Sequence, residues 1–108
     1  MDDVRTLHDR FDDYQVVDVR EPWEWEAGRI EGAVHIPLNS LMSGADQDAL
    51  DASRPVVLVC KTGNRSELAT MMLRARGYDA ENLEGGMEAW EAAGLPFSTP
   101  EGAPGRVA

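Results

Sequence analysis

Short apolar runs alternate along the chain with segments of helical periodicity. The runs QVVDV at 15–19 and PVVLVC at 55–60 are rich in β-branched residues, which predicts two buried strands. Weaker runs, AVHIP at 33–37 and AENL at 80–83, predict two more. Because the run at 55–60 is apolar almost throughout, we expect its strand to lie in the middle of the sheet.

Apolar residues spaced by three or four positions predict helices between these strands. The shorter helices are expected around 4–11, over 21–28 and over 87–94. The clearest helix is SELATMMLRARG at 66–77, with Ser66 as its N-cap and the glycine at its end as its stop. Its apolar residues predict a buried face made of Leu68, Met71, Met72 and Ala75.

This alternation predicts an α/β fold, in which a parallel sheet is covered by helices on both faces. The 108 residues suffice for one domain, which we place at 1–97, and the small, polar and proline-rich segment 98–108 is expected to be a flexible tail. In such folds ligands bind beyond the carboxyl ends of the strands. Cys60 lies at one such end, and Asp18 and Arg20 lie at another.

Composition narrows the classes of partner. The chain is 43% hydrophobic and 28% charged, contains no apolar run long enough to span a membrane, and has a formal net charge of −10. A field of that sign repels nucleic acid and anionic membranes, so neither is expected as a partner. The charged N-terminus lacks the order of a secretory signal and Cys60 is the only cysteine, which together predict a cytoplasmic, reducing location.

One segment of this acidic chain is basic, and it begins at the cysteine. Residues 1–54 contain 13 acidic and five basic residues, whereas 60–76 contain four basic residues against a single glutamate. Lys61, the only lysine, and Arg65 belong to this segment. Positive charge beside a cysteine favours the thiolate over the thiol.

The residues after the cysteine, CKTGNRS at 60–66, predict an anion-binding loop between a strand and a helix. Successive backbone N–H groups of such a loop point inward, and the helix that follows adds its positive end. Gly63 allows the positive φ or the close backbone approach that a tight loop needs. We therefore expect Cys60 to be a reactive, partly exposed cysteine of lowered pKa. The alternative is a buried structural cysteine followed by a helix cap.

Four segments together resemble the single-domain rhodaneses, the thiosulfate:sulfurtransferase family. They are the D-V-R strand end at 18–20, the segment GRIEGAVHIP at 28–37, the loop at 60–66 and the segment GGMEAW at 85–90. Their order and spacing match over about residues 4–97. The resemblance implies the rhodanese-like three-layer fold, a mostly parallel central sheet flanked by helices on both faces.

The resemblance also implies roles for individual residues. Cys60 matches the nucleophile that takes up a sulfane sulfur as a persulfide and passes it to an acceptor. Asp18 and Arg20 match a supporting pair near the pocket, acting as substrate contacts or as a structural ion pair. Arg29 departs from the family, in which many members have histidine at this position. The loop that surrounds the sulfur and binds the substrate matches Lys61, Thr62, Gly63, Asn64, Arg65 and Ser66.

The implied chemistry requires neither a cofactor nor a metal. Attack of the thiolate on a small anionic donor such as thiosulfate expels sulfite, a weakly basic leaving group that needs no general acid. His8 and His35 are therefore expected to be packing or surface residues. Because the chain has no second cysteine, the acceptor must be external: cyanide in vitro, and a thiol or a protein in the cell.

Other functions remain open at this point. A non-turnover persulfide carrier, or a binding module for a partner protein, would keep the same loop. A cysteine phosphatase or arsenate reductase would use a related loop, but those enzymes have one residue more between cysteine and arginine than the four present here. A mercaptopyruvate sulfurtransferase is nearer in chemistry, although such family members tend to have a different loop and two domains.

Overall fold

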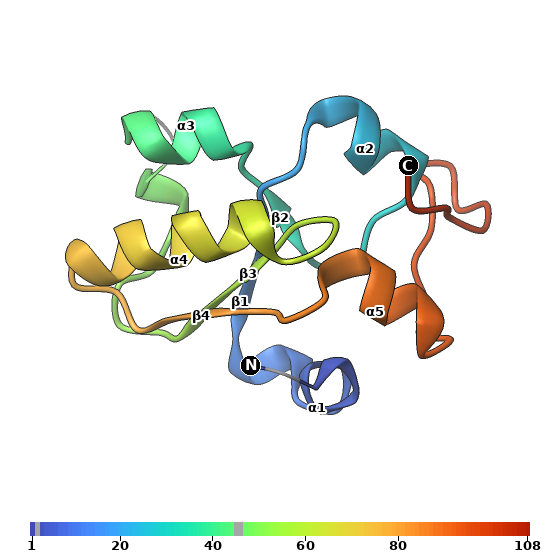
Figure 1. Ribbon diagram of the computed structural model, residues 1–108, viewed down its shortest axis with the longest axis horizontal. Coiled ribbons are helices and arrows are strands. Elements are labelled where there is room, and N and C mark those ends of the chain that lie inside the picture. The colour runs from blue at the N-terminus through green and yellow to red at the C-terminus, as the bar shows by residue number, and fades with distance from the viewer. Residues whose placement is uncertain (2, 45–46) are drawn as a thin grey trace.

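A computed structural model of the chain describes residues 1, 3–44 and 47–108. The described strands form one sheet in the order β2-β1-β3-β4, in which every neighbouring pair is parallel (Figure 1). These strands are β1 Gln15–Asp18, β2 Val34–His35, β3 Val56–Val59 and β4 Ala80–Asn82. The apolar run at 55–60 thus supplies an interior strand, as its composition predicts.

Helices cover both faces of this sheet, α3 and α4 on one side and α1 and α5 on the other (Figure 1). The predicted α/β three-layer fold is therefore confirmed. Among the described residues, no helix is both long enough and apolar enough to cross a membrane. The described helices are α1 Val4–Asp9, α2 Pro22–Ala27, α3 Leu38–Ser43, α4 Asn64–Ala75 and α5 Gly86–Ala92, with 3-10 turns at Phe11–Asp13 and Gln47–Ala49.

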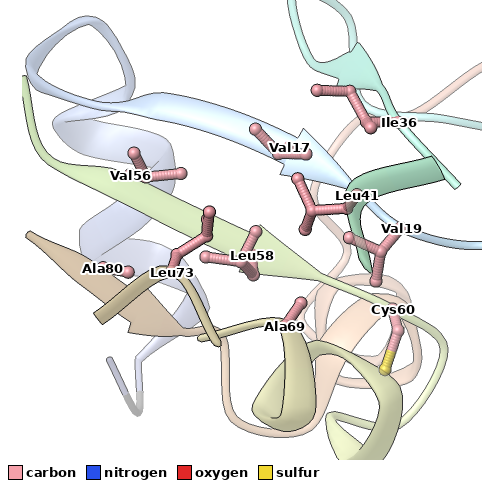
Figure 2. Packing of buried hydrophobic residues seen from close by; sticks show 10 residues of the cluster. All are labelled: Val17, Val19, Ile36, Leu41, Val56, Leu58, Cys60, Ala69, Leu73 and Ala80. Carbon is pink, nitrogen blue, oxygen red and sulfur yellow. The ribbon is translucent and has the colours of Figure 1, made fainter. Parts of the chain in front are cut away.

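The strands distribute their side chains between two cores, because successive residues of a strand point to opposite faces. On β3, Val56 and Leu58 join the cluster under α3 and α4, whereas Val57 and Val59 join the cluster under α1 and α5. Burial on both faces fixes β3 firmly, so the loop that follows it starts from a rigid point. Figure 2 shows the first cluster, made of Val17, Val19, Ile36, Leu41, Val56, Leu58, Cys60, Ala69, Leu73 and Ala80.

The carboxyl ends of β1 and β3 lie side by side. Asp18 pairs with Val59 in the strand register, and the amide of Val19 donates to the carbonyl oxygen of Val59 at 2.9 Å. Asp18, Arg20 and Cys60 therefore share one edge of the sheet, where parallel sheets place their binding sites.

Trp90 of α5 is the largest side chain of the second core. It is 1% exposed, and its Nε1 donates to the carbonyl oxygen of Pro96 at 2.9 Å. Trp90→Ala is expected to lower the free energy of unfolding by about 3 to 5 kcal/mol, the range for deleting a buried large aromatic ring. Denaturant titration of the two proteins measures this difference.

Trp23→Ala provides the matched control for this prediction. The side chain of Trp23 is 64% exposed, so the same chemical change should alter stability by no more than about 0.5 kcal/mol. Similar losses in the two variants would contradict the assignment of Trp90 to the core.

Helix α4 buries a different face from the one that its apolar residues predict. Leu68 and Met71 are 47% and 61% exposed, and of the predicted face only Met72 packs against the core. The residues that are buried instead have the same helical spacing but include two hydroxyl groups. Both hydroxyls are hydrogen-bonded, which removes most of the cost of burying them. This buried face consists of Ser66, Ala69, Thr70 and Leu73.

The segment 98–108, for which we predicted a flexible tail, lies against the domain. Ser98 forms an antiparallel bridge with Arg29, and the amide of Arg106 donates to the carbonyl oxygen of Ala27 at 3.0 Å. These bonds use backbone groups, so side-chain composition gives no indication of them. The segment is therefore not detached from the domain. Whether it is mobile stays a prediction.

Candidate active site

Cys60 begins the loop that leaves β3, and its sulfur points toward this loop (Figure 2). The amide of Gly63 donates to Sγ at 3.1 Å, and the hydroxyl of Ser66 lies within donating distance of Sγ at 3.2 Å. The residue is only 1% exposed, which is more buried than we expected. Cys60 thus combines the burial of a structural cysteine with the hydrogen-bond donors of a reactive one.

Helix α5 holds this loop from outside. The amides of Met87 and Glu88 donate to the carbonyl oxygens of Cys60 and Lys61, at 2.8 and 3.0 Å. In a planar trans peptide the N–H group points away from the C=O group, so these bonds turn the amides of Lys61 and Thr62 away from α5. The amide of Thr62 accordingly helps to lower the pKa of the Cys60 thiol. The N-terminus of α5 therefore orients the groups that surround the sulfur.

The loop passes into α4 at Gly63. This residue has a φ of +104°, in the left-handed region that favours glycine, and it is the N-cap of the helix. Ser66, which we predicted to be the N-cap, lies inside the first turn, because the helix already begins at Asn64. From that position the Ser66 hydroxyl reaches both Sγ of Cys60 and Oδ1 of Asn82.

Two opposing effects set the pKa of the Cys60 thiol. Burial raises the pKa, because the thiolate loses its hydration. Hydrogen bonds from the Ser66 hydroxyl, and from the amides of Ser66, Gly63 and Thr62, stabilise the thiolate and together outweigh burial. The pKa of Cys60 therefore lies below the ordinary value of a cysteine, which increases the thiolate fraction at neutral pH.

Arg65, at the start of α4, is paired with Glu24 of α2. Its Nη1 and Nη2 donate to Oε1 and Oε2 of Glu24 at 2.7 and 2.8 Å, which makes a bidentate ion pair. The hydrogen bonds from Arg65 hold the pKa of Glu24 below its ordinary value. The pKa of Arg65 is raised by Glu24 and also, to a smaller extent, by the charge of Cys60. Since this attraction is mutual, Arg65 favours the thiolate.

Arg65→Ala is expected to raise the pKa of the Cys60 thiol by about one unit or less, since the charge is partly screened by solvent. The substitution removes a cation that favours the thiolate and leaves Glu24 as an unpaired anion. The rate of alkylation by iodoacetamide, measured against pH, reports the thiolate fraction. Its midpoint should move to higher pH.

Glu24→Gln is the control for this shift, because it removes the negative charge and leaves Arg65 in place. The alkylation midpoint of this variant should move to lower pH. A profile that does not move in Arg65→Ala, or that moves in the same direction in both variants, would refute the electrostatic role given to this pair.

Asp18 and Arg20 form a buried ion pair next to the site. Nε and Nη2 of Arg20 donate to the carboxylate of Asp18 at 2.8 to 3.0 Å. Arg20 is 0% exposed and Asp18 is 1% exposed. The guanidinium also donates to the carbonyl oxygens of Glu24 and Gly28, at 3.3 and 2.8 Å. This geometry favours the structural alternative: the pair fixes α2 and, through it, Glu24.

The remaining loop residues lie at the outer rim of the site. Thr62 and Asn64 are exposed, and Lys61 is half-buried with the second positive charge of the loop. Among the described residues, no group of three or more His, Cys, Asp or Glu side chains is placed to hold a metal ion. A separate cavity of about 530 Å³ shares no residue with the loop, and its lining is mainly apolar and aromatic, including Phe11, Ile30, Trp90 and Phe97.

The two histidines pack against tryptophans. His35 stacks on Trp25 with ring centroids 4.7 Å apart, and His8 meets Trp90 edge-on at 5.7 Å. Arg29, the position at which the family pattern is broken, lies over the ring of Trp25 at 5.0 Å. Both histidines thus have the packing contacts that we predicted, and the expectation that neither acts as a base stays a prediction.

Three residues of the site were missed from the sequence: Glu24, Asn82 and Gly86. Asn82 donates from Nδ2 to the carbonyl oxygen of Gly63 at 3.0 Å and so ties β4 to the loop. Gly86 lets α5 approach the loop, since a Cβ atom there would overlap the carbonyl oxygen of Cys60. The paired glycines in GGMEAW were the one available signal, because they indicate a close backbone approach.

The fold and the loop together define an α/β domain that holds one cysteine among hydrogen-bond donors at the carboxyl edge of a parallel sheet. The family model described as Rhodanese-like domain matches residues 3–93, and the chain belongs to this family. The resemblance carried by its motifs is thereby confirmed.

Known proteins similar to this chain include enzymes of sulfur transfer. A sulfurtransferase of Allochromatium vinosum is 37% identical over 92 residues, which cover 84% of each chain. The probable adenylyltransferase/sulfurtransferase MoeZ of Mycobacterium tuberculosis is 42% identical over 76 residues, or 69% of this chain; the match spans only 19% of that protein. A solved rhodanese-related protein from Thermoplasma volcanium has a TM-score of 0.79 at 32% identity, covering 85% of this chain and 90% of that one.

Proposed function

We propose that this protein is a sulfurtransferase that moves a sulfane sulfur from thiosulfate, or a similar small anionic donor, to an external thiophilic acceptor. A persulfide on Cys60 carries the sulfur between the two half-reactions. The observation behind the proposal is the set of donors aimed at Sγ, from the amides of the loop and from Ser66. The relatives that bear the name sulfurtransferase support it.

In the first half-reaction, the thiolate of Cys60 attacks the outer sulfur of thiosulfate. A new S–S bond forms, the S–S bond within thiosulfate breaks, and its electron pair leaves with sulfite. No proton is required, because sulfite is stable as an anion. The persulfide that results is also an anion, so the same amides that stabilise the thiolate stabilise its terminal sulfur.

In the second half-reaction, the acceptor attacks the terminal sulfur of the persulfide. The Cys60 sulfur leaves as a thiolate, and the transferred atom ends as thiocyanate when the acceptor is cyanide, or as a new persulfide when it is a thiol. A low pKa of Cys60 favours this step as well, because a weakly basic thiolate leaves faster. Each half-reaction balances without an oxidant or a reductant.

Access to the sulfur is restricted. Cys60 is 1% exposed, whereas Thr62 and Asn64 at the rim are exposed, so a donor reaches Sγ by displacing part of this rim. Lys61 supplies positive charge that draws a small anion to this side of an otherwise acidic chain, whereas the charge of Arg65 is compensated by Glu24. A loop of this size suits a sulfur atom, and bulky donors should react poorly.

Intact mass spectrometry tests the proposal directly. The reduced protein is treated with thiosulfate and should gain the mass of one sulfur atom, located at Cys60. Addition of cyanide should remove this mass and release thiocyanate. No gain of sulfur on a demonstrably reduced thiol would overturn the proposal, and a gain that cyanide does not remove, but a protein thiol does, would indicate a persulfide carrier instead.

A further inference from the structure

The hydroxyl of Ser66 lies between two acceptors that compete for its one proton. Sγ of Cys60 is 3.2 Å away on one side, and Oδ1 of Asn82 is within hydrogen-bond distance on the other. The three residues are 0%, 1% and 8% exposed in the order Ser66, Cys60 and Asn82. A serine hydroxyl has a single hydrogen to donate, so it can serve only one of these acceptors at a time.

The contacts of Asn82 determine which end of its amide faces Ser66. Nδ2 donates to the carbonyl oxygen of Gly63 at 3.0 Å, and this leaves Oδ1 directed toward the hydroxyl. The opposite orientation would place Oδ1 against the carbonyl oxygen of Gly63, two acceptors without a proton between them. Asn82 is therefore fixed as an acceptor for the proton of Ser66.

We infer that Asn82 is a positioning residue that directs the single hydroxyl proton of Ser66 according to the charge on Cys60. While Cys60 is a thiol, Ser66 donates to Oδ1 of Asn82 and its oxygen is free to accept from the S–H group. When Cys60 is an anion, the Ser66 hydroxyl turns and donates to Sγ, and Oδ1 loses its donor.

No covalent bond to the hydroxyl changes in this rearrangement. The thiol proton leaves to the solvent, and Ser66 keeps its own hydrogen throughout. The thiolate gains the Ser66 hydroxyl as a donor, and Oδ1 of Asn82 loses it. Sγ and Oδ1 therefore compete for the same hydrogen bond. Asn82 consequently limits the lowering of the thiol pKa that Ser66 can produce, while its bond to Gly63 keeps the loop amides in place.

The charged groups on the surrounding elements are present whether Cys60 is a thiol or a thiolate. They do not provide another partner for the Ser66 hydroxyl. Arg65 favours the anion and is itself paired with Glu24, while the buried pair of Asp18 and Arg20 is internally neutralised. The other charged side chains of the loop, of α4, of the β4–α5 connection and of the first turn of α5 are Lys61, Glu67, Arg74, Glu84 and Glu88, of which all but Lys61 are exposed. None of them is a partner of the Ser66 hydroxyl among the contacts of the described residues.

A cycle of four proteins tests the inference: the wild type, Ser66→Ala, Asn82→Ala and the double variant. The measurement is the pH midpoint of alkylation of Cys60 by iodoacetamide. Ser66→Ala should raise the midpoint by about one to two units, the equivalent of a hydrogen bond to a charged group. In the Ser66→Ala background, Asn82→Ala should raise it further, because the anchor of Gly63 is lost.

In the wild-type background, Asn82→Ala should cause a smaller rise or a fall, because Ser66 no longer has a competing acceptor. The two shifts should differ by about 0.4 to 2 units, the pKa equivalent of couplings found between contacting residues. Equal shifts in the two backgrounds would overturn the inference, as would a Ser66→Ala midpoint identical to that of the wild type.

Asn82→Asp keeps the test decisive if Asn82→Ala does not fold, which circular dichroism will show. A carboxylate holds the hydroxyl proton more strongly than an amide, so its upward shift should be larger with Ser66 present than in Ser66→Ala. The coupling thus has the opposite sign to that of Asn82→Ala, and equal Asn82→Asp shifts in both backgrounds would refute the inference. Although the inference concerns the cysteine of the proposed function, alkylation needs no sulfur donor, so the two can fail separately.

Discussion

Cys60→Ser should abolish sulfur transfer while the protein stays folded. A serine hydroxyl is scarcely ionised at neutral pH and cannot take up a sulfane sulfur, so the rate of thiocyanate formation should fall by more than about three orders of magnitude, as in other enzymes that lose a covalent nucleophile. The fold should persist because Oγ can accept the hydrogen bond that the amide of Gly63 directs at Sγ. We expect the change in unfolding free energy to stay within about 1.5 kcal/mol, because the buried hydroxyl keeps a hydrogen-bond partner.

Cys60→Ala separates the chemical role of the sulfur from its structural one. This variant should be equally inactive, but it leaves the amide of Gly63 buried without an acceptor. Such a loss costs about 1 to 3 kcal/mol, so Cys60→Ala should be less stable than Cys60→Ser. Thiocyanate formation and denaturant titration measure the two properties. Cys60→Ser contains no thiol, because Cys60 is the one cysteine of the chain. Residual turnover in this variant would therefore contradict the proposed mechanism.

Gly86→Ala should disrupt both the stability and the reactivity of the domain. Gly86 has a φ of +53°, and a Cβ atom there would overlap the carbonyl oxygen of Cys60 and lie 2.8 Å from that of Lys61. Both atoms belong to the loop backbone, so the conflict can be relieved only by moving the loop or α5. We expect a cost of about 1 to 3 kcal/mol from this overlap, in addition to about 1 to 2 kcal/mol for alanine in the left-handed conformation.

Gly94→Ala isolates the overlap, because it shares the conformational cost without the contact. Gly94 has a φ of +72° and its Cβ would meet no atom within 4 Å. Denaturant titration should therefore show a larger loss for Gly86→Ala than for Gly94→Ala. The pH midpoint of Cys60 alkylation should rise only in Gly86→Ala, since displacing α5 disturbs the amides that stabilise the thiolate. Equal losses of stability with unchanged midpoints would mean that α5 does not hold the loop.

The strands and the cysteine loop could be predicted because their signals are local. An apolar run such as 55–60 has few alternatives to a buried strand, and the glycine and basic residues that follow it favour an anion-binding loop wherever the chain places it. The alternation of elements then fixed the class of fold. The loop consequently lies between a strand and a helix, as the sequence indicated, although Cys60 is more buried than predicted.

The buried face of α4 could not be predicted in this way. Ser66 and Thr70 are buried because partners elsewhere in the fold and in the helix satisfy their hydroxyls, whereas Leu68 and Met71 remain exposed. Hydrophobic periodicity assumes that apolar residues identify the core, and it fails where the core includes an active site with polar groups. The departure from the pattern therefore coincides with the site itself.

Contacts between residues distant in sequence could not be predicted either. Glu24 lies 41 residues before the Arg65 that it binds, and Asn82 lies 16 residues after Ser66. The sequence around each of them does not distinguish it from the other glutamates or asparagines of the chain. Asp18 holds Arg20, as the predicted pair requires, whereas the carboxylate that holds Arg65 is Glu24 of α2.

The bonds from α5 to the loop also determine when the thiol becomes reactive during synthesis of the protein. Met87 and Glu88 leave the ribosome after Cys60, so a growing chain that ends before them has the cysteine without the amides that orient its surroundings. An incomplete chain therefore carries a thiol of ordinary pKa, with a smaller thiolate fraction at neutral pH. The lowered pKa of the thiol therefore arises only when α5 docks, at the stage at which the completed fold also buries Cys60.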